Sequence, residues 1–172
     1  PLWGTEICEA KRAMWRDLTG TADLGDTFCT RIDWENKPRP DVLWSGQPCP
    51  NYSLGGTLSG SGGETGWMYV QQAQPILKLQ PNVAIIEMVA NALKVNDGEE
   101  VKQLTKALSE KYTTHQKVCR VWDYGDESNR ERLFIVCLHD RLGEVAKEYP
   151  TPLKDTRRVA RDIADPEDQV PR

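Results

Sequence analysis

The 172-residue chain has only two histidines, and its five cysteines are widely spaced with no Cys-x-x-Cys pair. This usage provides no zinc-site signature and predicts free thiols in a reducing compartment, the cytoplasm or, in a eukaryote, the nucleus. The sequence also lacks a signal peptide and any apolar run that could span a bilayer, so we expect no membrane partner. The net charge of −4 argues against a general nucleic-acid coat while leaving room for a local basic site.

The hydrophobic pattern alternates between short apolar runs and helical periodicity. Strands are expected at residues 42–44, 83–86, 115–122 and 133–138, and helices at residues 10–18, 67–79 and 98–112. The last two strands follow each other with only a polar loop between them. The pattern therefore predicts one domain with an α/β sheet that ends in an antiparallel hairpin.

Cys49 is the candidate nucleophile of the chain. It follows the apolar run 42–44 and precedes a stretch rich in Gly, Ser and Thr, residues 53–66. A thiol just beyond the carboxyl end of a strand lies where open α/β sheets bind their ligands. The stretch behind it is expected to be a mobile loop that closes over a substrate. The alternatives are a small core cysteine and a passive linker.

Two acids and two arginines are the other candidate functional residues. Glu6 ends a weak first strand, where an acid commonly binds ribose hydroxyls, and Glu87 follows a buried strand as a candidate general acid. Arg130 and Arg132 are two residues apart, so in a strand both point to one face and could clamp an anion or a base edge. Solvated surface positions are the alternative for all four.

Three blocks, in this order, resemble the cytosine-C5 methyltransferases. The first block, residues 41–53, resembles the Pro-Cys block of that family and reads Asp-Val-Leu-Trp-Ser-Gly-Gln-Pro-Cys-Pro-Asn-Tyr-Ser. Ile-Ile-Glu-Met-Val, residues 85–89, resembles the Glu-Asn-Val block. The third block resembles the Gln-x-Arg-x-Arg block and the strand that follows it. It consists of Asp-Tyr-Gly at residues 123–125 and of residues 130–136. The resemblance covers roughly residues 6–162.

The sequence departs from the family pattern beside the reacting groups. Met88 stands where the family has Asn, and Pro50 stands where Gln is usual. Tyr52 replaces a common Phe, and Ser128 occupies the usual Gln position of the arginine block. These changes affect supporting positions more than reacting groups, which indicates a divergent member.

The resemblance implies a Rossmann-like S-adenosylmethionine-dependent methyltransferase fold and methylation of cytosine C5 in DNA, as in restriction–modification systems. It implies Cys49 as the nucleophile that adds to C6 and Glu87 as the partner of N3. Arg132 and Arg130 would position the substrate. For the cofactor it implies Glu6 at the ribose, Ile7 on the adenine face, Asp26 at the adenine amino group, and Pro48 beside them. No metal is implied.

The resemblance also implies that the chain is the middle of such an enzyme. Residues 1–148 are expected to form a partial catalytic domain, and residues 149–172 a linker or extension toward a target-recognition region. The family's glycine-rich first block would precede Pro1 and its last block would follow the tail. An exposed sheet edge left by a missing first strand would favour self-association.

Three functional alternatives follow. The first is the DNA methyltransferase itself, with RNA as a less favoured substrate because a transfer-RNA-modifying branch shares the catalytic blocks. The second is an inactive methyltransferase-like fragment that acts as a binding or assembly module. The third, an unrelated thiol hydrolase, is disfavoured because no histidine is placed as an obvious partner for Cys49.

Overall fold

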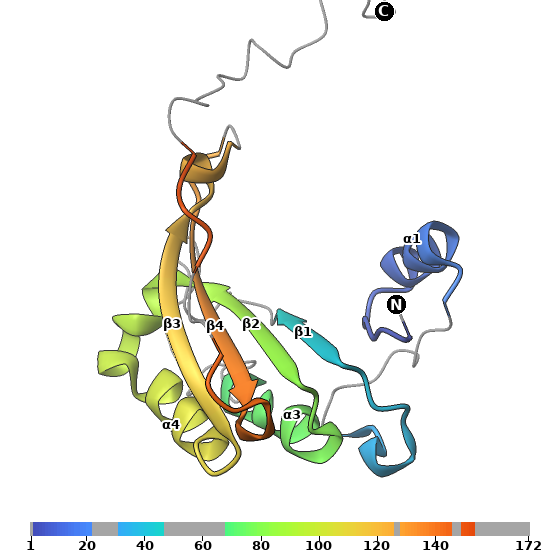
Figure 1. The fold of residues 1–172 in the computed structure, drawn as a ribbon. Helices are drawn as coiled ribbons and strands as arrows, with labels where there is room; N and C mark the ends of the chain where they lie inside the picture. The colour runs from blue at the N-terminus through green and yellow to red at the C-terminus, as the bar shows by residue number, and fades with distance from the viewer. Residues whose placement is uncertain (1, 22–30, 47–67, 126–127, 146–148, 154–172) are drawn as a thin grey trace, which may run out of the picture.

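The fold centres on one mixed sheet with helices packed on one face (Figure 1). The computed structural model describes residues 2–21, 31–46, 68–125, 128–145 and 149–153. The sequence also predicts a turn and a short strand over residues 25–32; residues 25–30 lie outside the described residues, and Arg31 and Ile32 are not in a strand. The Pro-Cys dipeptide and the expected loop at residues 53–66 also lie outside the described residues.

Four strands form the sheet in the order β1-β2-β4-β3. They are β1 (Val42–Gly46), β2 (Val83–Val89), β3 (Tyr112–Arg120) and β4 (Glu131–His139). β1 and β2 are parallel, whereas β4 runs antiparallel to both of its neighbours. The predicted antiparallel hairpin is therefore confirmed, and β4 inserts between β2 and β3.

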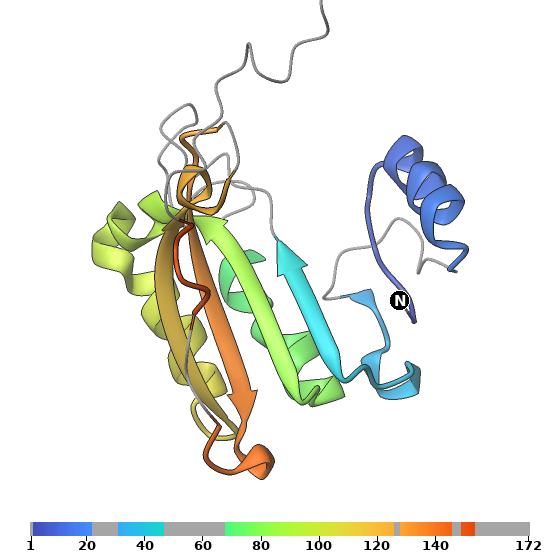
Figure 2. The same cartoon turned by 45° about the horizontal axis from the view of Figure 1, so that its top comes forward.

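Helices cover one face of this sheet (Figure 2). They are α2 (Met68–Gln71), α3 (Ala73–Leu79) and α4 (Glu99–Leu108). The strand residues on the covered face are buried, and with the helices they form a single core. These strand residues are Leu43, Ala84, Ile86, Met88, Leu133, Ile135 and Cys137. The sequence pattern places Cys119 and Cys137 within strands and predicts both in the core; Cys137 is buried there, whereas Cys119 is only half-buried.

The remaining helix, α1 (Glu9–Thr19), stands on the β1 side of the sheet and buries none of its residues. It ends at Gly20, whose φ of 63° is a left-handed cap that glycine adopts without steric cost. The helix itself matches the periodicity of residues 10–18. The segment before it, residues 2–7, is extended but is not one of the strands of the four-stranded sheet.

Two expectations about buried strands need correction. Val42 and Trp44 were expected in a buried, central strand, but β1 is the edge of the described sheet and their side chains are 56% and 63% exposed. Only Leu43 of that run is buried. β2 extends three residues beyond Ile86, so Glu87 lies within the strand rather than after its end.

Individual residues, Gln72 and Gly98, mark the starts of two helices. The helix expected at 67–79 is divided at Gln72, which is fully buried and begins α3. The expected helix start at 96–98 is confirmed: Gly98, with φ of 69°, precedes α4. A β-carbon there would come within 3.0 Å of the Leu93 carbonyl oxygen, which favours glycine. Tyr112, expected on that helix, instead opens β3.

A short segment, residues 149–153, lies against the hairpin, and Figure 2 shows it in front of β3 and β4. The Tyr149 hydroxyl donates to the His115 carbonyl oxygen at 2.7 Å, and the Leu153 N–H donates to the Asp123 carbonyl oxygen at 2.8 Å. Burial raises the pKa of the Tyr149 hydroxyl. In the described ranges, no helix has the length and apolar character needed to cross a membrane.

Candidate active site

A carboxylate and a guanidinium meet near the carboxyl end of β2. Arg132 Nε lies 2.6 Å from Glu87 Oε1, and the two side chains are only 15% and 27% exposed. The antiparallel register pairs Glu87 with Phe134 and Val89 with Arg132, so the two ionic residues are diagonal neighbours on one face. Charge-assisted contacts of this length fix both side chains more firmly than exposed ion pairs do.

The second oxygen of Glu87 faces the end of β1. The strand register pairs Gly46, the last residue of β1, with Glu87. A β-carbon on Gly46 would lie 3.4 Å from Glu87 Oε2, so the missing side chain keeps the space beside this oxygen open. Arg132 therefore holds Oε1, while Oε2 is directed toward the point where the chain leaves β1.

The end of β1 is anchored from the helical side of the sheet. The Ser45 hydroxyl donates to Gln72 Oε1 at 2.8 Å, and Gln72 Nε2 donates to the Tyr69 carbonyl oxygen at 3.4 Å. Buried polar groups that are paired in this way specify one position for the strand relative to the helices. Sequence patterns did not predict this contact, because residues 45 and 72 are distant in the chain.

Met88, which replaces the family's Asn, points away from this site. It is 1% exposed and belongs to the core under the helices, since successive strand residues face opposite sides of the sheet. The substitution therefore places an apolar side chain in an apolar environment. It removes no contact from Glu87 within the described residues.

The two candidate arginines have different surroundings. Arg132 lies inside β4 and binds Glu87, a pairing that the sequence did not reveal because it depends on the β2–β4 register. Arg130 lies just before β4, and its side chain is exposed. Its backbone carbonyl accepts the Val121 N–H at 2.9 Å, which closes the connection between β3 and β4.

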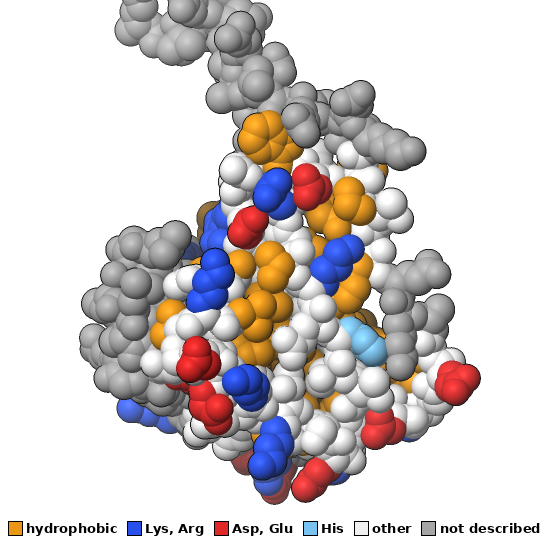
Figure 3. Space-filling view, turned by 90° about the vertical axis from the view of Figure 1, so that its left-hand side faces the viewer, with side chains coloured by type: hydrophobic (Ala, Val, Ile, Leu, Met, Phe, Trp, Pro, Cys, Tyr) orange, Lys and Arg blue, Asp and Glu red, His pale blue; other side chains and the backbone are white. Residues whose placement is uncertain are grey.

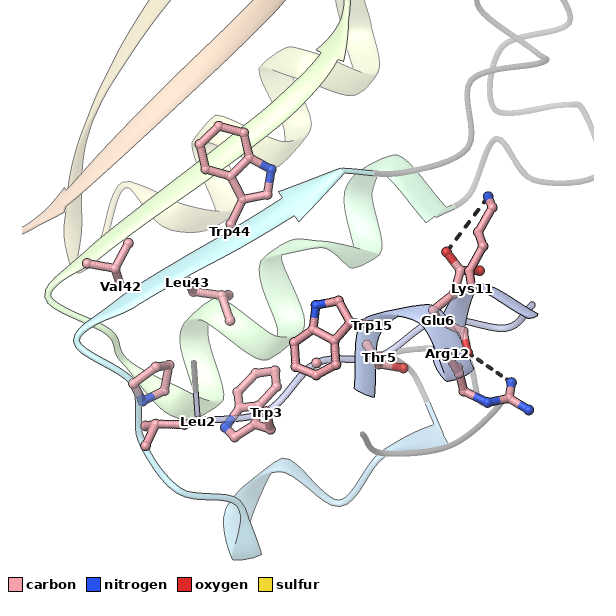
Figure 4. Close-up of a pocket in the computed structure, with 12 residues that line it drawn as sticks. Leu2, Trp3, Thr5, Glu6, Lys11, Arg12, Trp15, Val42, Leu43 and Trp44 are labelled. Carbon is pink, nitrogen blue, oxygen red and sulfur yellow. Dashed lines mark hydrogen bonds and ion pairs between the residues drawn. The ribbon is translucent and has the colours of Figure 1, made fainter. Parts of the chain in front are cut away.

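Glu6 and Ile7 lie apart from Glu87, between β1 and α1. Glu6 Oε1 accepts the Cys8 N–H at 2.9 Å, and Glu6 Oε2 lies 4.0 Å from Lys11 Nζ (Figure 4). The Glu6 side chain is 37% exposed and Ile7 is 52% exposed. A half-exposed carboxylate beside an exposed aliphatic side chain has the chemistry expected for binding a ribose and an adenine face. Asp26, Pro48 and Cys49 lie outside the described residues.

Glu6 also lines a cavity of about 470 Å³ between residues 2–6, α1 and β1. We call this cavity the slot. Its lining is mostly apolar and includes three of the six tryptophans of the chain, Trp3, Trp15 and Trp44. Figure 4 shows residues 2–6 and β1 on opposite sides of it.

Charges elsewhere are mixed. On the side of β3 and α4, Figure 3 shows acidic and basic side chains interspersed around apolar ones. This side therefore offers no continuous positive surface for nucleic-acid phosphates in the part drawn in colour. A search of the described residues finds no cluster of three or more His, Cys, Asp or Glu side chains that could hold a metal ion.

Comparisons with known proteins agree with this architecture. Residues 3–170 match the family model described as C-5 cytosine-specific DNA methylase. The chain is 25% identical over 142 residues to the type II methyltransferase M.HhaI of Haemophilus parahaemolyticus, covering 82% of this chain and 43% of the relative. It is 29% identical over 140 residues to M.SsoII of Shigella sonnei, covering 80% and 37%. The chain thus spans less than half the length of either relative.

Solved structures share the fold. A DNA modification methyltransferase encoded in an Escherichia coli prophage superposes with a TM-score of 0.77 at 15% identity, covering 96% of this chain and 49% of that one. The Entamoeba histolytica methyltransferase EhMeth gives 0.56 at 13% identity, covering 88% and 47%. These likenesses are consistent with a partial Rossmann-like sheet. Because the family model covers nearly the whole sequence, the chain belongs to the C-5 cytosine-specific DNA methylase family.

Proposed function

We propose that this chain contributes the reacting groups for transfer of a methyl group from S-adenosylmethionine to C5 of cytosine in DNA. The observation that carries the proposal is the Arg132–Glu87 pair, whose second carboxylate oxygen, Oε2, faces the end of β1. Cys49 follows Gly46 by only three residues, so chain connectivity keeps it within about 11 Å of that point. The family's nucleophile and its carboxylate partner therefore belong to one region.

Cys49 has the role of nucleophile in this proposal. Its thiolate forms a bond to C6 of cytosine, which raises the electron density at C5. Glu87 holds the proton at N3 and so stabilises the adduct. S-adenosylmethionine, when bound, supplies the methyl group. The C5 proton then leaves to a base and the C6–sulfur bond breaks, which restores the aromatic ring and the free thiolate.

Arg132 acts through Glu87 as a positioning residue. Its guanidinium fixes one carboxylate oxygen and thereby orients the other toward the substrate side. Arg130, which is exposed beside the same strand, is placed to contact the substrate or its phosphates. The target base must leave the helix stack to reach such a site, and residues 53–66 are proposed to close around it.

The cofactor would be held by groups on the β1–α1 side. The half-exposed Glu6 carboxylate suits ribose hydroxyls, and Ile7 suits one face of adenine. Asp26 and Pro48 complete this proposed site from the family resemblance alone. We further propose that residues 1–148 are the partial catalytic domain and that residues 149–172 lead toward a target-recognition region. The bacterial relatives favour a cytoplasmic location.

Trapping the adduct tests this proposal. The full chain would be incubated with S-adenosylmethionine and a pool of duplexes of random sequence in which 5-fluorocytosine replaces cytosine. Fluorine at C5 cannot leave as the proton does, so the C6–sulfur bond persists and intact-mass spectrometry detects a protein–DNA adduct. We expect the adduct with the wild-type chain and with Cys8→Ser, which removes an exposed thiol. Cys49→Ser should form none.

The same measurement addresses the alternative. The second candidate function is an inactive methyltransferase-like module for binding or assembly. Absence of an adduct with the wild-type chain would reject independent catalysis and favour this module. An RNA pool with the same fluorinated base separates the two nucleic-acid substrates, because a stronger adduct with RNA would contradict the assignment to DNA.

A further inference from the structure

A row of side chains on the face of the sheet opposite the helices joins the Arg132–Glu87 pair to β3. Cys119 of β3 is the register partner of Arg132. Directly opposed residues of an antiparallel pair point to one face of the sheet, with β-carbons about 4.5–5.5 Å apart. Arg132 therefore has Glu87 beside it on the β2 side and the half-buried Cys119 thiol beside it on the β3 side.

Tyr124 contacts this thiol from the connection between β3 and β4. It is the last residue of η6 (Val121–Tyr124), the short 3-10 helix that follows β3. Its hydroxyl donates to the Pro150 carbonyl oxygen at 3.1 Å and lies 3.7 Å from Cys119 Sγ. Burial raises the pKa of this hydroxyl, and the contact with Cys119 acts in the same direction. The hydroxyl therefore keeps its proton at neutral pH and remains a donor.

The acceptor of this proton belongs to residues 149–153, a segment that we call the strap. The strap lies against the hairpin on the face opposite the helices (Figure 2). The Tyr149 hydroxyl and the Leu153 N–H attach its two ends to the carbonyl oxygens of His115 and Asp123, at 2.7 and 2.8 Å. The carbonyl between these two attachments is consequently held in place.

We infer that Tyr124 is a positioning residue for the Arg132–Glu87 pair. Held on the strap, its hydroxyl keeps the Cys119 side chain beside Arg132. This closes the β3 side of the arginine and leaves its guanidinium the side on which Glu87 lies. The inference rests on the proposed methyl transfer for its catalytic consequence. The coupling of Tyr124 to the ion pair is independent of that reaction.

The alternative is a purely structural role, in which the Tyr124 hydroxyl attaches the strap and does nothing more. Tyr149 provides the matched comparison, because it also attaches the strap through a hydroxyl that donates to a backbone carbonyl. Its acceptor on His115 lies farther along β3, away from Cys119. Tyr124→Phe and Tyr149→Phe therefore each remove one strap hydroxyl, and only the first removes the contact with the thiol.

Exchange of the Arg132 Nε–H proton with water measures the ion pair directly. In the isotopically labelled full chain, its NMR signal is identified by its loss in Arg132→Lys. An Nε–H bonded to a carboxylate exchanges when the pair opens, so faster exchange reports a looser pair. We expect Tyr124→Phe to speed this exchange about fivefold and Tyr149→Phe to change it by less than about twofold. Amide exchange in α4 corrects for any change in global stability.

A Cys119 variant tests the route from Tyr124 to Arg132. Cys119→Ala removes the sulfur and should speed exchange of the Arg132 Nε–H by about the same factor as Tyr124→Phe. The double variant should exchange no faster than either single variant, because both changes break one contact. If circular dichroism shows that Tyr124→Phe does not fold, Cys119→Ala takes its place in every comparison.

The rate of adduct formation with 5-fluorocytosine duplexes tests the catalytic consequence. Tyr124→Phe should lower the maximal rate about fivefold and leave the DNA concentration at half-maximal rate unchanged, because it alters the presentation of Glu87 and not DNA binding. Tyr149→Phe should change neither value. A wild-type chain that forms no adduct contradicts the proposed function alone, and the exchange measurement still decides whether Tyr124 positions the ion pair.

Four results would overturn the inference. The first is an equal exchange rate of the Arg132 Nε–H in the wild type and in Tyr124→Phe. The second is an equal acceleration by Tyr149→Phe, which would show general loosening of the strap. The third is an unchanged exchange rate in Cys119→Ala, and the fourth is adduct formation by Tyr124→Phe at the wild-type rate.

Discussion

The helices α1 and α4 are amphipathic and nearly equal in length, yet among the described residues only α4 buries its apolar face. α4 has 10 residues and buries Val101, Leu104 and Leu108 against the sheet and the helices α2 and α3. α1 has 11 residues and buries none, and its Leu18 is 74% exposed. Amphipathic periodicity thus identifies a helix and its apolar face without revealing whether this chain covers that face.

The same contrast applies to two strands of the sheet, β4 and β1. β4 lies between β2 and β3, and both of its edges are paired. β1 has a described neighbour on one side only, and two of its five side chains are exposed hydrophobic groups. The β2–β4–β3 region with α4, which we call the completed core, buries most of its apolar side chains, whereas the β1–α1 region leaves several of its own exposed among the described residues. Each prediction below compares these two regions.

The largest expected difference is in the free energy of unfolding lost when one leucine on each helix is replaced by alanine. Leu104→Ala in α4 removes a side chain that is 0% exposed and should lower the free energy of unfolding by about 2–5 kcal/mol. Leu18→Ala makes the same change in α1, where the side chain is mostly in solvent, and should cost less than about 0.5 kcal/mol. Urea denaturation followed by circular dichroism measures both. Equal losses would show that α1 is packed as firmly as α4.

Alkaline pH should weaken the completed core through Cys137. Burial raises the pKa of this thiol from 9.0 to about 12, so the folded state keeps a proton that the unfolded chain releases. The stabilisation is complete below pH 9 and is lost as the pH rises toward 12. Between these pH values the thiol lowers the free energy of unfolding by at most about 1.4 kcal/mol per pH unit. Tyr112, whose pKa burial raises to about 12, acts in the same direction.

Cys137→Ala isolates the thiol contribution to this slope. The variant loses some stability at every pH because of the smaller side chain, but its free energy of unfolding should fall less steeply between pH 9 and 12. Tyr112 is present in both proteins, and its pKa is raised mainly by burial, so most of its effect cancels; the part of that shift caused by the charge of Cys137 is lost in the variant and adds to the thiol contribution. Parallel curves for the wild type and the variant in urea titrations at several pH values would contradict the assignment.

The sequence predicted where helices and strands form in both regions better than it predicted which strands pair with each other. The helix start at Gly98 and the final antiparallel hairpin depend on local signals, and both are confirmed. The insertion of β4 between β2 and β3 and the contact of Arg132 with Glu87 depend on strand order and register. Those are set by contacts between residues more than forty positions apart, which periodicity within one segment does not encode.

Trp44 is a single residue for which the sequence pattern did not predict the neighbours. Its apolar run predicted a buried strand, because the run records a preference for apolar surroundings. The side chain is nevertheless 63% exposed and contacts the ring of Phe134 edge-on, with centroids 6.2 Å apart. The pattern therefore described the surroundings that this residue type prefers, and the described chain provides only part of them.

Replacing the arginines at the start of β4 should change the free energy of unfolding by an intermediate amount. Arg132→Ala leaves the Glu87 carboxylate without its ionic partner at a site that is about three-quarters buried, and should cost about 1–2 kcal/mol. Arg130→Ala changes an exposed side chain and should cost less than about 0.5 kcal/mol. A double-mutant cycle of Arg132→Ala with Glu87→Gln measures the coupling. A coupling near zero would mean that the ion pair does not orient Glu87.

The smallest free energies should appear as local opening of α1, measured by hydrogen exchange. An 11-residue helix that buries none of its residues is marginal in water, so its amides should exchange through openings of about 0–2 kcal/mol. Amides of α4 should exchange only near the global free energy of unfolding. Strong protection of α1 in the free chain would instead mean that its apolar face is already covered.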